Sequence, residues 1–354
     1  MRIRTIHKNI PLLISKPHIL PALEASGIKT TYDLLFTPLP DILARLCARA
    51  AEDVLTEDIV TLQDEIAVAC AAPGIRGDQL VEKELSDMET MKPQTFAPLG
   101  VQSVDNLLGE TLYGPYVVEI SGLAGSGKST IALQVVIRRL AHDDESSALW
   151  IDCSGDFAGE RARRMCQALG LDNDAASATL QRLQVVLSFE MDQFQTTLDS
   201  VEASLSETPE ASMRYIVVDP ITPLLAGQIT GSSSQGHATM TSTMRQLARI
   251  AQEHKITILV INRTATAAIH NSLSSFPGVT AKPALGPTFT FLAHATIWLS
   301  TASAALGRGH TERPRPEGGQ THIVEVFRSR VGLSHQWGTF YIQDGVVVEN
   351  RDEF

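Results

Sequence analysis

The stretch "YVVEISGLAGSGKST", residues 116–130, decides the fold. An apolar run rich in β-branched residues leads directly into a glycine-rich loop. The loop is followed by "STIALQVVIRRLA", residues 129–141, whose apolar residues recur at helical spacing. Residues 122–130 fit the pattern G-x-x-x-x-G-K-[ST]. This order of strand, loop and helix predicts a P-loop, in which backbone N–H groups surround the phosphates of a nucleotide.

The residue types of this loop match the chemistry of nucleotide binding. Glycines let the backbone wrap the phosphates, Lys128 is placed to reach the β- and γ-phosphates, and the Ser129 hydroxyl is placed to bind Mg²⁺. The expected cofactor-binding residues are Gly122, Leu123, Ala124, Gly125, Ser126, Gly127, Lys128, Ser129 and Thr130. The alternative, a loop with a purely structural role, is disfavoured by the strand and helix that flank it.

A second apolar run supplies the carboxylate that such a site needs for its metal ion. "RYIVVD", residues 214–219, has the pattern of a strand that ends in Asp219. A strand-terminal Asp is weak evidence alone, but beside a P-loop it is expected to help Ser129 position Mg²⁺. The sequence therefore predicts ATP and Mg²⁺ as cofactors.

Short β-branched runs alternate with helical segments from residue 101 onward. The expected strands lie at 116–121, 148–153, 183–189, 214–219 and 256–262. Such alternation predicts βαβ units in a mainly parallel sheet covered by helices. Near the C-terminus apolar runs follow one another closely, and Asp344-Gly345 predicts a hairpin, so an antiparallel edge is expected. Residues 99–354 are the expected α/β core.

The first part of the chain has a different pattern. Residues 1–72 carry apolar residues at helical spacing and predict a small all-helical domain. Gly27 lies between two such runs, as in a helix-hairpin-helix turn, and Thr30 or Thr31 is placed to cap the next helix. Contact of this turn with a DNA phosphate and a role in protein contact both remain open. Residues 73–98, rich in acids, Pro and Gly, are the expected linker, with room for a short helix.

Composition limits the classes of partner. The formal charge of −11 excludes nucleic-acid binding by bulk electrostatics, so any DNA contact must be local. The four cysteines are widely spaced and show neither a disulfide framework nor a zinc pattern. Residues 1–23 are basic, but three prolines disfavour a targeting peptide. We expect a soluble intracellular protein that does not enter a membrane, since no run reaches about 20 apolar residues.

Two polar segments lie beyond the ends of expected strands. Residues 226–240 and 263–295 are rich in Gly, Ser, Thr and Ala and predict mobile loops that grip a polymer or ligand beside the nucleotide; plain disorder is the alternative. Arg263 and Lys282 are the candidate DNA contacts of the second segment. So few cations predict modest, salt-sensitive affinity for single-stranded or branched DNA. The basic stretch 307–319 supplements this contact or is a solvated loop.

The order of these parts resembles the eukaryotic and archaeal branch of the RecA-type recombinases. The resemblance rests on the helical N-terminal region, "LGVQSVDNLLG" at 99–109, the P-loop, Asp219, "LARIAQEHKITILVIN" at 247–262 and "KPALG" at 282–286. With "RLQVVLSFEMDQF" at 182–194, "KPALG" is most similar to the D-type paralogue of eukaryotes. The resemblance implies a RecA-like core, nuclear homologous-recombination repair, ATP near a subunit interface, single-stranded DNA in the two loops, and assembly with other recombinase paralogues.

The departures from that family are informative. Where active recombinases carry a water-activating glutamate, "WIDCSG" places Ser154, a poor base at neutral pH, so no catalytic residue is secure and Asp156 is a fallback base. After Asn262, the expected sensor of the γ-phosphate, Arg263 replaces the family's Gln; it either pairs with phosphate or is solvated. Phe96 is followed by "APL", so a clear Phe-x-x-Ala self-assembly motif is missing.

These features lead to one main hypothesis and two alternatives. The main one is an ATP-binding recombinase paralogue in a hetero-oligomer that binds single-stranded DNA and assists loading of the main recombinase, with at most weak DNA-stimulated ATP hydrolysis. The first alternative is an autonomous DNA-dependent ATPase with strand-exchange or motor activity. The second is an interaction scaffold that nucleotide merely stabilises. The sequence leaves open the partners and their stoichiometry.

Overall fold

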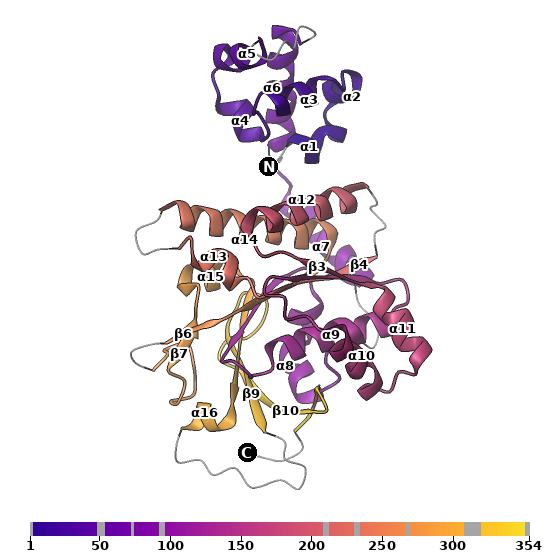
Figure 1. Cartoon of the computed structure of the whole chain (residues 1–354), viewed down its shortest axis with the longest axis vertical. Coiled ribbons are helices and arrows are strands. Elements are labelled where there is room, and N and C mark those ends of the chain that lie inside the picture. The colour runs from indigo at the N-terminus through magenta and orange to yellow at the C-terminus, as the bar shows by residue number, and fades with distance from the viewer. Residues whose placement is uncertain are drawn as a thin grey trace. The chain divides into compact units, whose positions relative to one another are not determined.

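The structure is a computed structural model, and it describes residues 3–47, 54–71, 74–91, 96–207, 212–229, 234–266, 270–307 and 320–350 (Figure 1). The chain forms two compact units. One comprises residues 1–92 with 201–203, and the other comprises residues 93–200 and 204–354. Where the linker was expected, helix α7 spans Gly77–Met91.

Short helices build the N-terminal unit. They are α1 (Ile3–Ile6), the 3-10 turn η1 (His7–Asn9), α2 (Pro11–Ser15), α3 (Ile19–Ala25), α4 (Thr31–Phe36), α5 (Leu39–Cys47) and α6 (Thr56–Cys70). Their apolar faces meet in one core, to which Leu23, Ile28, Leu34 and Leu62 contribute fully buried side chains. The helical interpretation of this region is confirmed, because residues at helical spacing fill a single core.

The turn between α3 and α4 has the predicted chemistry. Gly27 adopts φ +81°, a left-handed conformation that glycine takes without strain. The Thr30 hydroxyl accepts from the Asp33 N–H at 3.0 Å, and the Asp33 carboxylate accepts from the Thr30 N–H at 2.9 Å. Thr30 rather than Thr31 is therefore the N-cap, in a capping box that satisfies two backbone donors of α4.

A nine-stranded sheet forms the second unit, in the order β11-β10-β9-β8-β1-β5-β4-β2-β3. The strands are β1 (Val117–Gly122), β2 (Ser147–Asp152), β3 (Leu183–Leu187), β4 (Met213–Asp219), β5 (Thr257–Asn262), β8 (Ala295–Thr301), β9 (Thr321–Ser329), β10 (Trp337–Gln343) and β11 (Val346–Glu349). The strands from β8 to β3 in this order are parallel, whereas β9, β10 and β11 pair antiparallel. The predicted RecA-like sheet with an antiparallel edge is confirmed.

Helices cover both faces of this sheet (Figure 1). One layer contains α8 (Gln102–Tyr113), α9 (Lys128–His142), α10 (Gly159–Ala168) and α11 (Asn173–Gln181); the other contains α12 (Met191–Glu207), α13 (Thr222–Ala226) and α14 (Ser234–His254). Helix α9 buries Ile131, Val135 and Val136 in the core that Ile120 of β1 and Val217 of β4 complete. This packing fixes the start of α9 against the ends of β1 and β4.

The C-terminal hairpin forms as predicted. β10 pairs antiparallel with β11, and Asp344 and Gly345 of the turn have φ of +51° and +81°. Positive φ at both central residues gives the twist that tight hairpins prefer. None of the described helices is long and apolar enough to cross a membrane.

The segment 263–295, expected to be a mobile loop, contains regular secondary structure. Strands β6 (Thr264–Thr266) and β7 (Ala281–Pro283) pair antiparallel, and helix α15 spans Gly286–Leu292. The Glu325 carboxylate of β9 accepts from the Ser274 hydroxyl and the Ser275 N–H, which anchors the intervening turn. Composition missed this order because the anchor is a buried carboxylate about 50 residues away in sequence.

The other expected loops are only partly described. Within the segment 226–240, Ala226 is the last residue of α13, and residues 234–240 form the first part of α14. Residues 230–233, 267–269 and 308–319 lie outside the described residues, and with them most of the basic stretch 307–319. A short helix, α16 (Ala302–Leu306), follows β8.

Candidate nucleotide-binding site

The P-loop joins the end of β1 to the start of α9. Gly122 has φ +152°, and a Cβ atom at this position would lie 2.2 Å from the Leu299 carbonyl oxygen of neighbouring β8. Gly127, at the N-cap of α9, has φ +93°. Positive φ favours glycine at both positions. The loop precedes α9, so its backbone N–H groups lie at the N-terminus of that helix.

Lys128 is folded over the loop. Its Nζ donates to the carbonyl oxygens of Gly122 at 2.7 Å and Leu123 at 2.8 Å. Burial lowers the pKa of its amine to about 8; the Asp219 charge opposes this shift and the Arg263 charge adds to it. Within the described part of the chain this half-desolvated cation donates to carbonyl oxygens alone, so it is suited to a phosphate group.

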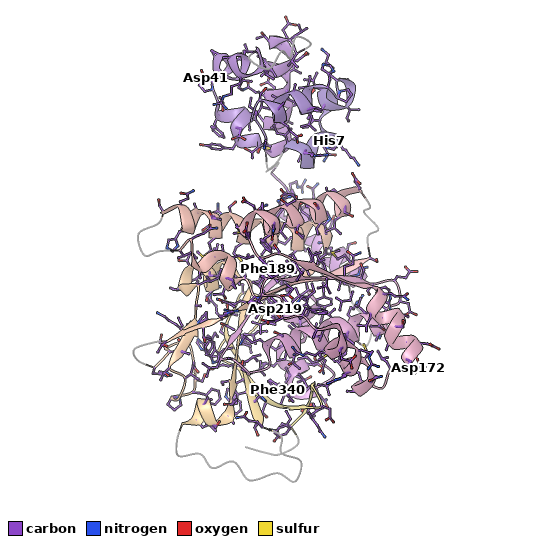
Figure 2. All side chains as sticks on the ribbon, viewed as in Figure 1. His7, Asp41, Asp172, Phe189, Asp219 and Phe340 are labelled. Atoms are coloured by element: carbon purple, nitrogen blue, oxygen red, sulfur yellow. The ribbon has the colours of Figure 1, made fainter. Side chains whose placement is uncertain are left out.

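Asp219 projects from the end of β4 (Figure 2). Burial raises the pKa of its carboxyl above the ordinary value, and the nearby Ser129 hydroxyl opposes this shift. A half-buried carboxylate near a hydroxyl is a fitting donor set for Mg²⁺, which takes oxygen ligands from one or two carboxylates, waters and phosphates. Ser126 adds to this fit, because its buried Oγ has no hydrogen-bond partner within the described residues.

A cavity of about 430 Å³ lies over these groups. Its lining includes Gly122, Ala124, Lys128, Ser129, Leu133, Trp150, Ser154, Asp156, Phe157, Ala158, Arg161, Asp219, Pro220, Ile261, Arg263 and Thr264. Small-molecule sites commonly occupy about 300–1,000 Å³. The cavity is of the right size, and its lining includes four of the predicted P-loop residues, the predicted metal ligand Asp219, and Ser154 and Asp156 of the turn after β2; Leu123, Gly125, Ser126, Gly127 and Thr130 of the P-loop are not in its lining.

The turn after β2 is organised by Asp152. Its buried carboxylate accepts from the backbone N–H groups of Ser154, Gly155, Asp156 and Phe157 at 2.8–3.3 Å. Burial acts to raise the pKa of Asp152, but these four donors outweigh it and hold the pKa below its usual value. Asp152 is not among the residues that line the cavity; its carboxylate is turned into its own loop and holds the backbone of Ser154 and Asp156, which do line it.

Ser154 and Asp156 form a pair on the cavity wall. The Ser154 hydroxyl donates to Asp156 Oδ2 at 2.7 Å, and both residues line the cavity. Glu160 lies in the first turn of α10, and its carboxylate pairs with Arg163 and Arg164. Of the three acids in this stretch, only Asp156 therefore reaches the cavity.

Of the two predicted sensor residues, Arg263 lines the cavity and Asn262 does not. Asn262 is fully buried: its amide donates to Glu119 Oε1 at 2.7 Å, and its oxygen accepts from the Thr222 hydroxyl at 2.8 Å. Arg263 lines the cavity. Lys282 is exposed on β7, opposite Ala265 of β6, and is not among the residues that line the cavity.

Sequence analysis missed one charged residue of the cavity, Arg161. Arg161 of α10 donates from Nη2 to the Thr130 hydroxyl at 2.7 Å and lines the cavity. Its neighbours Arg163 and Arg164 lie on the same helix and point to Glu160 instead. Sequence gave no signal that distinguishes these arginines, since only the packing of α10 against the P-loop helix decides which one faces inward.

Comparison with known proteins agrees with this geometry. A sequence model of the Rad51 family matches residues 95–312. The chain belongs to the Rad51 family. It is 28% identical over 313 residues to the DNA repair protein RAD51 homolog 4 of Bos taurus, covering 86% of this chain and 90% of that protein. The Mus musculus protein of the same name is 26% identical over 314 residues, covering 86% and 89%.

More distant members match the core. The DNA repair and recombination protein RadA of Metallosphaera sedula is 26% identical over 211 residues, which cover 58% of this chain and 62% of that protein. A crystal structure of the RadB recombinase superposes with a TM-score of 0.54 at 20% identity, covering 71% of this chain and 98% of that one. At this identity the likeness shows the fold alone. The predicted membership of the RecA-type recombinases, with similarity to the D-type paralogue, is confirmed by the family match and the two mammalian relatives.

Proposed function

We propose that this Rad51-family chain is an ATP-binding recombinase paralogue of homologous-recombination DNA repair in the nucleus. It acts within a hetero-oligomer of paralogues on single-stranded or branched DNA and assists loading of the main recombinase, while hydrolysing ATP slowly. The names of its mammalian relatives, DNA repair protein RAD51 homolog 4, support the repair role. The site supports the nucleotide and the slow hydrolysis.

The P-loop, residues 122–130, is the proposed phosphate site. Its backbone N–H groups and Lys128 would bind the phosphates, and Ser129 and Asp219 would hold Mg²⁺. When bound, Mg²⁺ neutralises phosphate charge. Arg161 lines the same space.

The observation that carries the slow hydrolysis is the Ser154 side chain beside an otherwise complete site. The Ser154 hydroxyl donates to Asp156 and presents no basic atom of its own at neutral pH. A positioned general base typically contributes 10²- to 10⁴-fold to rate. A site that retains the phosphate loop and metal donors but lacks this base is suited to holding ATP as a structural signal.

The environment of Phe96 supports assembly with partners over self-polymerisation. The Phe96 ring lies 5.3 Å from the His142 ring and 5.4 Å from the Arg139 guanidinium carbon, both on α9 of its own chain. The half-buried Phe96 ring thus already packs against its own chain. Together with the missing Phe-x-x-Ala pattern, this favours a heteromeric role.

DNA contact is assigned to the β6–β7 ribbon. Arg263 precedes β6, and the exposed Lys282 lies on β7. With so few cations, affinity should be modest and should fall steeply with salt. Failure of the assembled complex to bind single-stranded DNA even at low salt would remove this part of the proposal.

The first test measures nucleotide binding and ATP turnover of the full-length protein, with and without single-stranded DNA. We expect Mg²⁺-dependent ATP binding that Lys128→Ala abolishes, and turnover far below that of an active recombinase. Rapid turnover by the protein without partners would contradict slow hydrolysis. Loss of partner assembly in a folded Lys128→Ala variant would distinguish the proposed role from a scaffold that nucleotide merely stabilises.

A second candidate function is an autonomous DNA-dependent ATPase that uses Asp156 as its base. The cavity position of Asp156 favours this candidate, because its carboxylate lies on the wall where water would be activated. Asp156→Ala would then abolish turnover and leave ATP binding intact. Turnover that is unchanged in Asp156→Ala would exclude it.

A further inference from the structure

Residues 271–281, which lie between β6 and β7 in sequence, fold into a turn that is closed by its own hydrogen bonds. The Asn271 N–H donates to the Val279 carbonyl oxygen at 2.9 Å, and the Ser274 N–H donates to the Asn271 carbonyl oxygen at 2.9 Å. The Phe276 N–H donates to Ser274 Oγ at 3.1 Å. We call residues 271–281 the docked segment.

Two polar contacts tie the docked segment to the core of its own unit. The buried carboxylate of Glu325 on β9 accepts from the Ser274 hydroxyl at 2.7 Å and from the Ser275 N–H. The Gly278 N–H donates to the Ala305 carbonyl oxygen of α16 at 2.9 Å. A Cβ atom on Gly278 would lie 2.5 Å from that oxygen, so only glycine lets the backbone approach this closely.

Apolar side chains of the docked segment complete a small core. Phe276 and Val279 are buried in one cluster with Trp298 of β8 and Phe327 of β9, whose rings stack with their centroids 4.9 Å apart. The Phe276 ring also meets the ring of Trp337 on β10 edge-on, with the centroids 5.3 Å apart. The segment therefore packs as part of the fold, although its composition is that of a loop.

Asn271 joins the docked segment to the β6–β7 ribbon. Its Nδ2 donates to the carbonyl oxygen of Ala281, the first residue of β7, at 2.9 Å. Ala281 pairs with Thr266 of β6, and the exposed Lys282 follows it, opposite Ala265. The position of Lys282 therefore depends on where the docked segment lies.

We propose that Glu325 is a positioning residue: by holding the docked segment on the sheet, it presents the β6–β7 ribbon to single-stranded DNA in a preformed position. This inference rests on the proposed DNA contact of the ribbon and names what places that contact. The effect of Glu325 passes through Ser274 and Ser275, since the carboxylate itself is buried. A segment that is already in place loses little conformational entropy when DNA binds.

Hydrogen exchange at single amides of the full-length protein, without DNA, tests the docking itself. Glu325→Leu removes the acceptor of both serines, and its effect is measured at the Gly278 N–H, which donates to α16 instead. Loss of hydrogen bonds to a charged group predicts about 10- to 100-fold faster exchange there. Glu325→Gln, which keeps an acceptor oxygen, should lie between Glu325→Leu and wild type.

Gly278→Ala tests the second contact independently. The added Cβ would meet the Ala305 carbonyl oxygen and displace the segment from α16, while Glu325 stays in place. Its effect is measured at the Ser275 N–H, which Glu325 accepts. If the two contacts hold one cooperative unit, exchange at Ser275 should rise in Gly278→Ala, just as exchange at Gly278 rises in Glu325→Leu.

Glu349→Gln is the matched control. The Glu349 carboxylate on β11 accepts from the Ser103 N–H of α8, so exchange at Gly278 should match wild type in this variant. Amides of β1, in the interior of the sheet, report whether a variant loosens as a whole. Ser274→Ala removes one donor to Glu325 and gives the same measurement if Glu325→Leu does not fold. Unchanged exchange in the docked segment of the folded variants, or an equal rise in β1, would overturn the inference.

The DNA measurement uses the complex purified through this chain and fluorescein-labelled oligo(dT), with anisotropy recorded over a range of salt. Glu325→Leu and Gly278→Ala should weaken binding about 10-fold, because the binding-competent position is less populated. The slope of affinity against salt should stay that of wild type, since no phosphate contact is lost. Lys282→Gln should instead lower that slope by about 0.7, the value for one phosphate contact on a single strand.

Failure of this inference and failure of the proposed function give different results. If wild type and the variants bind oligo(dT) equally well although Gly278 exchanges faster in Glu325→Leu, the DNA contact stands and the role of Glu325 fails. A changed salt slope in Glu325→Leu and Gly278→Ala would also overturn the positioning role. If the wild-type complex does not bind oligo(dT) even at low salt, the proposed DNA contact fails and the inference falls with it.

Discussion

Replacement of Asp152 by Asn tests how the turn after β2 is held. In the wild type, Oδ1 accepts from the N–H groups of Ser154, Gly155 and Asp156, and Oδ2 accepts from the Phe157 N–H at 2.9 Å. Asn keeps one oxygen for the first three donors. Its amide nitrogen would face the Phe157 N–H, so two donors would oppose each other.

The magnitude follows from these contacts. A hydrogen bond to a charged group contributes about 1.5–3 kcal/mol, so loss of the Phe157 bond and of the charge on the other three predicts a loss of about 2–4 kcal/mol in the free energy of unfolding. Because the pKa of Asp152 is lowered, its contribution is present above the unfolded pKa near 3.8 and is lost as pH falls through the folded pKa. The difference between wild type and variant should therefore be full at pH 6 and shrink toward pH 3.

Urea unfolding of both proteins measures this difference, and hydrogen exchange of the amides of residues 154–157 locates it. Asp156→Asn is the control. The Asp156 carboxylate is exposed, and in the described part of the turn it accepts one hydrogen bond, from the Ser154 hydroxyl. Its replacement should therefore change the free energy of unfolding by no more than about 0.5 kcal/mol. An Asp152→Asn protein within 0.5 kcal/mol of wild type, with unchanged exchange at these amides, would refute the reasoning.

Three further predictions follow from single positions. Ser154→Glu should raise ATP turnover about 10²- to 10⁴-fold if the absent base limits hydrolysis, and unchanged turnover would place the limit elsewhere. Gly122→Ala should lower the free energy of unfolding by more than about 4 kcal/mol, because its Cβ would meet the Leu299 carbonyl. Gly345→Ala is the control: open space surrounds this position, so thermal unfolding should show a loss of only about 1 kcal/mol in the same free energy. Burial raises the pKa of Glu119 and favours its neutral form. The free energy of unfolding of Glu119→Gln, measured in urea, should therefore lie within about 1 kcal/mol of the wild-type value, whereas that of Glu119→Leu should be lower by about 2–4 kcal/mol.

Local rules predicted much of the fold. The P-loop, the strand that ends in Asp219, the alternation of strands and helices, and the turn at Asp344-Gly345 each depend on residue types within about 15 positions. The Thr30 cap is of the same kind, since its partner Asp33 lies three residues away. Such features can be predicted from sequence because their physical cause, backbone geometry or the spacing of apolar residues, is local.

Long-range contacts account for what sequence missed. The segment 263–295 has the composition of a loop, yet Glu325 of β9 anchors its turn and the ribbon pairs β6 with β7. Asn262 was expected to sense phosphate, and burial against Glu119 removes it from the cavity. Each outcome depends on a partner residue that is distant in sequence, and such a pairing cannot be predicted from composition.

The sequence by itself determined the family, the P-loop pattern of residues 122–130 and the presence of Ser154 where the family carries a base. Only the tertiary structure decided which charged groups share the cavity: Arg161 and Arg263 face it, Glu160 pairs away from it, and Asp152 turns into its own loop. The reason is physical. Residue identity sets what a side chain is able to do, but the packing of helices on the sheet and the satisfaction of buried donors set the direction in which it points.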